Sequence, residues 1–444
     1  MKTTRRGFLG LAGAGLLAAA RGAHSRPPAQ DAPASPIKLP PWKYGTSSTS
    51  TETVLMFRGN PSHTFYGTGP LPDKPRLHWS YRMEAFHTEL HGHPKTWAGT
   101  GWTGQATKLG DHVFIGAVDR SLYAFDAKAG TLAWRHRATR MFKSSNCLYE
   151  NRLYVGNVDN FLRCIDCATG QIVWKLDTTK DLDSSPCVVD GKLYVTGESG
   201  NAWCIDPRTG KPLWKTFLGG VGPGSLIGSN GSETSPAIAD GELYAATYDG
   251  ELFCVDIATS KIKWKANTGD DTDASPVVHG DHVWIASEEG APYVYCFARK
   301  DGKLVWKFDY GKGTADAVPP PKASRSRTNG TDQYGGSGYW STPAVKDGRL
   351  YIGSQKPVFL CLDARSGKLL WQFKTGSNIW SSPCVIDDKV VFACSDRNLY
   401  ILDAKTGRET WRYDLKGHCI STPCIVGGEI FIGSAEGTFF ALGA

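Results

Sequence analysis

The segment LYVTGESGNAWCIDPRTGKPLW (193–214) is one of eight related segments that follow one another along the chain. Its short alternating strands, a turn before glycine and a closing tryptophan recur in LYVGNVDNFLRCIDCATGQIVW (153–174) and VVFACSDRNLYILDAKTGRETW (390–411). Four of the seven intervals between closing tryptophans are 40 or 42 residues, and the others, 55, 50 and 65, contain an insertion. A period near 40 residues with four short strands is typical of one β-propeller blade.

The closing tryptophans have the same position in every segment, so we expect them to share one structural role. A large aromatic side chain at the end of each blade is suited to packing against the neighbouring blade. These residues are Trp79, Trp134, Trp174, Trp214, Trp264, Trp306, Trp371 and Trp411.

The two ends of the repeat region complete each other. The last segment, IFIGSAEGTFFALGA (430–444), lacks the outer strand that carries the tryptophan, and RLHWSYRM (76–83) contains that strand. Joining the first and last strands in one blade removes exposed sheet edges. We therefore predict an all-β, eight-bladed β-propeller whose last blade is closed by an N-terminal strand.

The chain before the propeller has two parts of different composition. Residues 1–20 contain TRRGFLG (4–10) and a short apolar run ending in three alanines, which predicts a twin-arginine signal peptide. Residues 21–53 are rich in Pro, Ala and Ser and predict a disordered tether before the propeller, residues 54–444. We expect a monomer exported to the periplasm or the exterior, without a transmembrane segment once the signal is removed.

Charge and cysteine positions exclude two other classes of protein. The net charge of +7 falls to +4 when Lys2, Arg5 and Arg6 leave with the signal, which is too weak to predict nucleic-acid binding. The twelve cysteines would suggest disulfides in an exported protein, but most recur at equivalent core-facing blade positions. We therefore predict buried free thiols. The recurring cysteines are Cys164, Cys204, Cys254, Cys296 and Cys361 in third strands, and Cys147, Cys187, Cys384 and Cys424 in inner strands.

The repeat resembles that of the PQQ-like, tryptophan-docking β-propellers. LDAKTGRETW (402–411) and FDAKAGTLAW (125–134) are similar to the docking turn of that family, and FRGNPSHT (57–64) is similar to its lead-in. The resemblance implies one of two functions: a quinoprotein dehydrogenase that holds pyrroloquinoline quinone (PQQ) and Ca²⁺, or a scaffold like the propeller lipoprotein of the outer-membrane barrel-assembly machine. Fold alone does not separate them.

The chain departs from both branches of the family. The dehydrogenases resembled here typically have adjacent cysteines beside the quinone, and this sequence has no Cys-Cys dipeptide and no C-x-x-C-H haem motif. The scaffold branch is lipidated, whereas no cysteine follows the apolar run of residues 1–20.

Three insertions, 84–101, 216–232 and 309–339, precede inner strands and should emerge on one face of the disc. The same face carries the residue before each Ser/Thr-Ser/Thr-Pro motif, where carboxylates of successive blades face tryptophans. Such an arrangement suits a cation, a sugar or an amphipathic ligand, or else it only solvates a loop junction. The predicted binding residues are Trp102, Lys143, Asp183, Glu233, Asp273, Trp340 and Trp380, followed by Ile420 in the last blade.

The first insertion also contains three histidines. His87, His91 and His93 have a spacing that can chelate zinc or copper, and the alternative is that they are polar surface residues.

No nucleophile elbow, P-loop or dinucleotide motif occurs in a suitable context. The leading interpretation is therefore a non-catalytic binding or scaffold propeller of the cell envelope, with a protein or glycan partner and no firmly predicted cofactor. The alternative is a small dehydrogenase of alcohols or sugars that depends on PQQ and Ca²⁺. In that case Asp273 is the candidate catalytic base, Asp183 and Glu233 are candidate metal ligands, and Trp340 or Trp380 stacks on the quinone.

Overall fold

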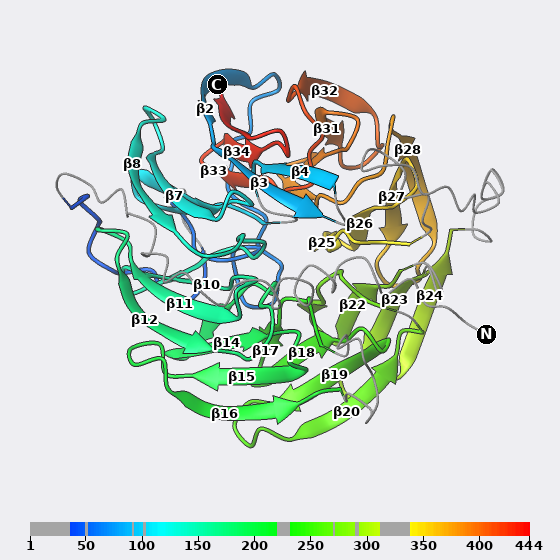
Figure 1. Ribbon diagram of the computed structural model, residues 1–444. Helices are drawn as coiled ribbons and strands as arrows, with labels where there is room; N and C mark the ends of the chain where they lie inside the picture. The colour runs from blue at the N-terminus through cyan, green and yellow to red at the C-terminus, as the bar shows by residue number, and fades with distance from the viewer. Residues whose placement is uncertain are drawn as a thin grey trace.

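The computed structural model describes residues 36–48, 52–90, 93–100, 104–219, 231–269, 271–288, 293–310 and 338–444. All regular structure in these ranges is β-strand, and eight sheets stand around a central axis (Figure 1). The predicted eight-bladed propeller is confirmed.

Each blade runs from a short inner strand to a longer outer strand, and the bounds of the strands follow in blade order. Blade 1 contains β1 (Thr53–Val54), β5 (Thr107–Leu109), β6 (His112–Gly116), β7 (Ser121–Asp126) and β8 (Leu132–Arg137). Blade 2 contains β9 (Cys147–Tyr149), β10 (Arg152–Val155), β11 (Phe161–Asp166) and β12 (Ile172–Asp177); blade 3 contains β13 (Cys187–Val189), β14 (Lys192–Thr196), β15 (Asn201–Ile205) and β16 (Pro212–Phe217). Blade 4 contains β17 (Ala237–Ala239), β18 (Glu242–Ala246), β19 (Glu251–Asp256) and β20 (Ile262–Asn267); blade 5 contains β21 (Val277–His279), β22 (His282–Ala286), β23 (Tyr293–Ala298) and β24 (Leu304–Asp309).

The remaining blades follow the same order. Blade 6 contains β25 (Ala344–Lys346), β26 (Arg349–Gly353), β27 (Val358–Asp363) and β28 (Leu369–Lys374); blade 7 contains β29 (Cys384–Ile386), β30 (Lys389–Ala393), β31 (Asn398–Asp403) and β32 (Glu409–Asp414). Blade 8 contains β33 (Cys424–Val426), β34 (Glu429–Gly433), β35 (Thr438–Gly443) and β2 (Arg76–Arg82). A separate hairpin consists of β3 (Ala85–Leu90) and β4 (His93–Ala98).

The last blade is closed by the N-terminal strand, as predicted. β2 pairs with β35 in antiparallel register, from Arg76 opposite Gly443 to Arg82 opposite Thr438. Figure 1 shows β2 beside the C-terminal end of the chain. The ring is therefore joined by backbone hydrogen bonds between the two ends of the repeat region.

The closing tryptophans connect neighbouring blades. In seven of them the indole Nε1 donates a hydrogen bond to the backbone carbonyl in the turn after the third strand of the next blade. These bonds join Trp79 to Ala127 (2.8 Å), Trp134 to Cys167 (2.9 Å), Trp174 to Pro207 (2.9 Å), Trp214 to Ile257 (3.1 Å), Trp264 to Arg299 (2.8 Å), Trp306 to Ala364 (3.1 Å) and Trp371 to Ala404 (3.2 Å). The eighth, Trp411, packs with Tyr413, their ring centroids 5.9 Å apart.

A second circle of hydrogen bonds holds the inner strands together. In blades 1 to 7 a backbone N–H just before the inner strand donates to the side chain at the equivalent position of the next blade; where the Ser/Thr-Ser/Thr-Pro motif is present, this is its second residue. The bonds run from Gln105 to Ser145 (2.8 Å), Ser145 to Ser185 (3.0 Å), Ser185 to Ser235 (2.9 Å), Ser235 to Ser275 (2.9 Å), Ser275 to Thr342 (3.0 Å), Thr342 to Ser382 (3.0 Å) and Ser382 to Thr422 (3.4 Å). A parallel bridge between Gln105 and Thr422 completes the circle.

Residues 53–70, here called the plug segment, run along the inner strands. The segment bonds to Leu148 of blade 2, Ile238 of blade 4, Val278 of blade 5, Val345 of blade 6 and Ile425 of blade 8. It also pairs with blade 1 through β1 and β5. Inner strands have an edge with no further strand of their own blade, and the plug segment supplies hydrogen-bond partners for that edge.

The buried Arg58 anchors the plug segment. Its guanidinium donates to the carbonyl oxygens of Pro343 and Pro383 and lies over the ring of Tyr66, with Cζ 4.7 Å from the centroid. Nearby, the Nδ1 of His63 bonds to the carbonyl oxygen of Pro276 at 2.7 Å. Both side chains therefore bind carbonyl groups of the repeated proline.

Part of the predicted tether is packed instead of free. Within residues 36–48, the side chains of Ile37, Leu39, Trp42 and Tyr44 contact the core between blades 1 and 2. The apolar side chains of this stretch explain why it leaves solvent. No helix in the described ranges is long and apolar enough to cross a membrane.

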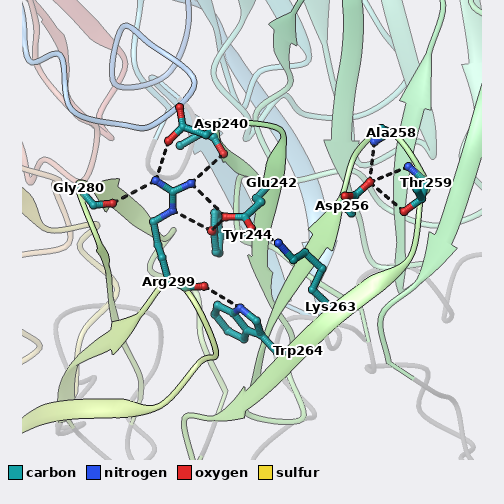
Figure 2. A network of polar contacts seen from close by, with 11 residues as sticks. Asp240, Glu242, Tyr244, Asp256, Ala258, Thr259, Lys263, Trp264, Gly280 and Arg299 are labelled. Atoms are coloured by element: carbon teal, nitrogen blue, oxygen red, sulfur yellow. Dashed lines mark hydrogen bonds and ion pairs between the residues drawn. The ribbon is translucent and has the colours of Figure 1, made fainter.

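Polar contacts add to the packing between blades, and Figure 2 shows the example of Arg299. Its guanidinium, from blade 5, donates to Asp240 Oδ2 (2.8 Å), Glu242 Oε2 (3.0 Å) and the Tyr244 hydroxyl (3.1 Å), all from blade 4. All twelve cysteines are described, and each is a buried free thiol, as predicted from the repeat.

Candidate functional site

The residues that precede the Ser/Thr-Ser/Thr-Pro motifs lie around the axis on one face, and we call them the rim. The circle of hydrogen bonds at the residues two positions further along the chain holds these positions in register. Lys143, Asp183, Glu233, Asp273, Trp340, Trp380 and Ile420 make up the described rim, and Trp102 lies outside the described residues.

One half of the rim is acidic. The Nζ of Lys143 lies 2.6 Å from Oδ2 of Asp183, and their side chains are 12% and 5% exposed. Further round, carboxylate oxygens of Asp273 and Glu288 lie within 4.8 Å of one another, and burial together with the charge of Asp273 raises the pKa of Glu233. Lys143 and Asp183 therefore lie largely out of solvent, and the binding role of the rim stays a prediction.

The other half of the rim is aromatic and apolar. The rings of Trp340 and Trp380 are tilted by 40° with centroids 4.1 Å apart, and both indoles are buried together with Ile420. Asp273 and Trp340 hold the same position in blades 5 and 6, which a hydrogen bond from Ser275 N to Thr342 Oγ1 (3.0 Å) joins. The acidic and aromatic halves thus form one continuous arc.

Beside the rim lies a second set of positions, in the loop between the second and third strands of each blade, which we call the loop ring. Its backbone is fixed by bonds from Glu198 N to the Asp181 carbonyl (3.2 Å), Glu288 N to the Asp271 carbonyl (2.9 Å) and Gln355 N to the Gly338 carbonyl (2.9 Å). Each acceptor precedes a rim residue by two positions, so the loop ring is in register with the rim. The loop ring contains Val118, Val158, Glu198, Tyr248, Glu288, Gln355, Ser395 and Ala435.

Sequence reasoning missed the loop ring. The residues Glu198, Tyr248, Glu288 and Gln355 are polar and fall in four successive blades, 3 to 6, while blades 1, 2 and 8 have Val or Ala there. Aligning the repeats on the small residues that end each second strand would have revealed this contrast. A polar stretch over blades 3 to 6, which include the three blades with rim carboxylates, is the signal that could have identified them.

Rim and loop ring together form two carboxylate triads. In the first, ligand oxygens of Asp183, Glu198 and Glu233 all lie within 4.8 Å of one another. In the second, the same is true of Asp271, Asp273 and Glu288. Ca²⁺ binds oxygens at about 2.3–2.6 Å, so oxygens at this spacing can share one such ion.

Burial and mutual repulsion make the carboxyls hard to ionise. Burial, together with the charges of Asp183 and Asp181, raises the pKa of Glu198 to about 8. Burial and neighbouring carboxylates also raise the pKa of Glu233 well above its usual range and that of Glu288 to about 12. A cation beside these carboxyls would favour their ionised form and lower the raised pKa values.

Two oxygens of the first triad have no partner in the structure. Oδ1 of Asp183 and Oε1 of Glu233 are buried without a hydrogen bond. Buried acceptors of this kind are costly unless a ligand or ion satisfies them. Lys143 contributes one positive charge; although burial lowers its pKa, the carboxylates of Asp183 and Glu233 hold that pKa above the usual value.

The first insertion forms the β3–β4 hairpin, which Figure 1 shows reaching from blade 8 toward the middle of the disc. At its base, Gly99 accepts a bond from Val118 N (3.1 Å), a loop-ring residue of blade 1. Of the three histidines, His87 bonds through Nδ1 to Oγ1 of Thr96 at 3.0 Å. His91 and the side chain of His93 lie outside the described residues, so the predicted metal site there stays a prediction.

The donor set fits a divalent cation better than it fits the quinone. Carboxylates supply the oxygen ligands that Ca²⁺ prefers. PQQ is itself a polycarboxylate, so its carboxylates would meet the carboxylates of the rim. Lys143, the positively charged side chain of the described rim, is already paired with Asp183. The described rim therefore does not fit the free quinone, and we derive no reaction step through it.

The fold defines the chain as an eight-bladed β-propeller with an acidic and aromatic rim on one face. Its residues 76–308 and 294–444 match the family model described as outer membrane protein assembly factor BamB, and the chain belongs to this family of PQQ-like propellers. A search of curated proteins finds no match.

Similar solved structures come from both branches of the family. The quinohemoprotein alcohol dehydrogenase of Comamonas testosteroni aligns with a TM-score of 0.70 at 15% identity, over 89% of this chain and 81% of that chain. A europium-containing methanol dehydrogenase aligns with 0.70 at 14% identity, over 89% and 99%. BamB of Moraxella catarrhalis aligns with 0.54 at 16% identity, over 83% and 100%. At these identities the likeness shows the fold alone.

Proposed function

We propose that this chain is an exported, non-catalytic binding propeller of the cell envelope, whose rim binds its ligand through a divalent cation. The observation that carries the proposal is the presence of two carboxylate triads on the same rim as the paired indoles of Trp340 and Trp380. The carboxylates would hold the cation, and the indoles would cover an apolar part of the ligand. The leader-like segment TRRGFLG (4–10) and the description of the family support an envelope location.

Calorimetric titration of the metal-free protein with Ca²⁺ at pH 7.5 tests this function. We expect saturable binding that is at least tenfold weaker in Asp273→Asn, because Asp273 belongs to one triad and occupies the rim position next to Glu233 of the other. Asp301→Asn, in an exposed turn of blade 5, is the matched control and should bind as the wild type does. Absence of binding at millimolar Ca²⁺ would refute the function.

The second candidate function is the dehydrogenase that depends on PQQ and Ca²⁺. It is favoured by the position of Asp273 among the rim carboxylates and by the fold shared with two dehydrogenases. Incubation with PQQ and Ca²⁺ followed by gel filtration, with alcohols and sugars assayed against an artificial electron acceptor, separates the two functions. Retained quinone and turnover that is lost in Asp273→Ala would replace the binding function by the enzymatic one.

A further inference from the structure

We propose that the rim holds two divalent cations side by side, one in each carboxylate triad, and that together they bind the hydroxyl groups of a neutral sugar. This inference rests on the proposed function and adds to it the number of cations and the class of ligand.

The first argument is the geometry of the two triads. Asp183, Glu198 and Glu233 come from blades 3 and 4, whereas Asp271, Asp273 and Glu288 come from blade 5, so the triads share no residue. Glu233 and Asp273 occupy the same rim position of neighbouring blades, which the hydrogen bond from Ser235 N to Ser275 Oγ (2.9 Å) holds side by side. Three carboxylates leave several of the six to eight oxygen positions around Ca²⁺ open to waters or ligand hydroxyls.

The second argument is charge. Six carboxyl groups face the single ammonium of Lys143 in a largely buried arc. One divalent cation leaves most of this negative charge uncompensated, whereas two bring the ionised site close to neutral. A nearly neutral site with open coordination positions favours a neutral polyhydroxyl ligand over an anion.

The third argument is independent of the carboxylates and comes from Gln355. This loop-ring residue is 4% exposed, and neither Nε2 nor Oε1 of its amide has a hydrogen-bond partner. Its backbone bond to Gly338 matches that of Glu288 to Asp271, which places Gln355 in the blade of Trp340, next round the ring from the second triad. A buried amide with an unused donor and an unused acceptor indicates a missing polar ligand.

The chemistry of a sugar matches the two cations, the amide of Gln355 and the indoles of Trp340 and Trp380. A hydroxyl both donates and accepts, as the amide of Gln355 requires. Neighbouring hydroxyls can coordinate the cations, and the apolar face of the ring can lie on Trp340 and Trp380. An aliphatic ligand would leave Gln355 unsatisfied.

Equilibrium dialysis with radioactive Ca²⁺ measures the number of cations. We expect two per wild-type chain, and one in each of Asp271→Asn and Glu198→Gln, because each substitution removes one ligand from one triad. One cation in the wild type would overturn this inference and leave the proposed function standing. Zero cations would overturn both.

Sugar binding is measured by tryptophan fluorescence during titration with glucose, mannose and N-acetylglucosamine, with and without EDTA. We expect at least one sugar to bind, to be released by EDTA, and to bind at least tenfold more weakly to Gln355→Leu, which keeps both cations. Gln171→Leu, at an exposed position, is the control. Binding of inorganic phosphate in place of all three sugars, or equal sugar binding by Gln355→Leu, would overturn the ligand class.

Discussion

Gly210 lies so close to Trp174 that a Cβ atom placed on it would come within 2.7 Å of the indole Cδ2. Its φ of +72° is also in the left-handed region that favours glycine. The equivalent position of the next blade holds Ser260 with φ +59°. The left-handed backbone strains Ser260, because serine has a Cβ atom, whereas it does not strain Gly210.

These two positions predict opposite effects on stability. Gly210→Ala should lower the free energy of unfolding by about 2–4 kcal/mol, through clash and strain. Ser260→Gly should raise it by up to about 1 kcal/mol, because it relieves the strained backbone. Denaturant titration of both variants checks the pair, and a destabilised Ser260→Gly would contradict the argument.

The plug segment depends on the buried guanidinium group of Arg58. Replacing Arg58 by Met should cost about 3–5 kcal/mol, because the carbonyl groups of Pro343 and Pro383 lose their charged donor in the interior. Arg76→Met, on the exposed face of β2, should change stability by less than about 0.5 kcal/mol. Urea unfolding followed by fluorescence measures both, and equal midpoints would show that the segment does not brace the inner strands.

Acid should destabilise the protein through His63. Burial lowers the pKa of this imidazole to about 3, although its bond to the Pro276 carbonyl opposes the shift. A lowered folded-state pKa means that the stability is present above about pH 6.5 and is lost as the pH falls toward 3.

Between pH 7 and pH 4.5, the wild type should therefore lose about 2–3 kcal/mol more than His63→Asn does. The exposed His279→Asn is the control and should follow the wild type. Denaturation curves across this range decide the matter: parallel loss in all three proteins would assign the acid sensitivity to other groups.

Alkaline pH should destabilise the metal-free protein through Glu198. Because its pKa is raised to about 8, the folded state favours the protonated carboxyl. That contribution is fully present below about pH 4.5 and is lost as the pH rises through 8.

In EDTA, Glu198→Gln should lose about 1–3 kcal/mol less than the wild type between pH 5 and pH 8. The same substitution should weaken Ca²⁺ binding, so stability and binding change in opposite directions. Glu150→Gln, an exposed carboxyl, serves as the control. If Glu198→Gln loses as much stability as the wild type between pH 5 and pH 8, the pKa of Glu198 is not raised in the metal-free protein.

The cysteines give a chemical prediction. Thiol titration of the denatured protein without reductant should find most of the twelve cysteines free, because each is a buried thiol in the folded chain. Recovery of four or fewer would contradict the structure.

The rim shows which site residues the sequence repeat can identify and which it cannot. Asp183, Glu233 and Asp273 were identified as neighbours because they occupy one position of a repeat, and the circular hydrogen bonds keep that position on one face. Glu198 and Glu288 were missed, because they lie in a loop whose side chains meet the rim only after the blades have folded. The tether was also misjudged at residues 36–48, where composition concealed four apolar anchors.

By itself the sequence determined the number of blades, the closure by residues 76–83 and the position of the tryptophans. These features depend on short-range patterning that every blade repeats, so one chain contains eight copies of the same information. Only the tertiary structure decided that Asp183, Glu198 and Glu233 converge, that Glu288 meets Asp271 and Asp273, and that the amide of Gln355 is buried without a partner. Such contacts link different blades or different loops, and they depend on the rotation between neighbouring sheets, which no local pattern encodes.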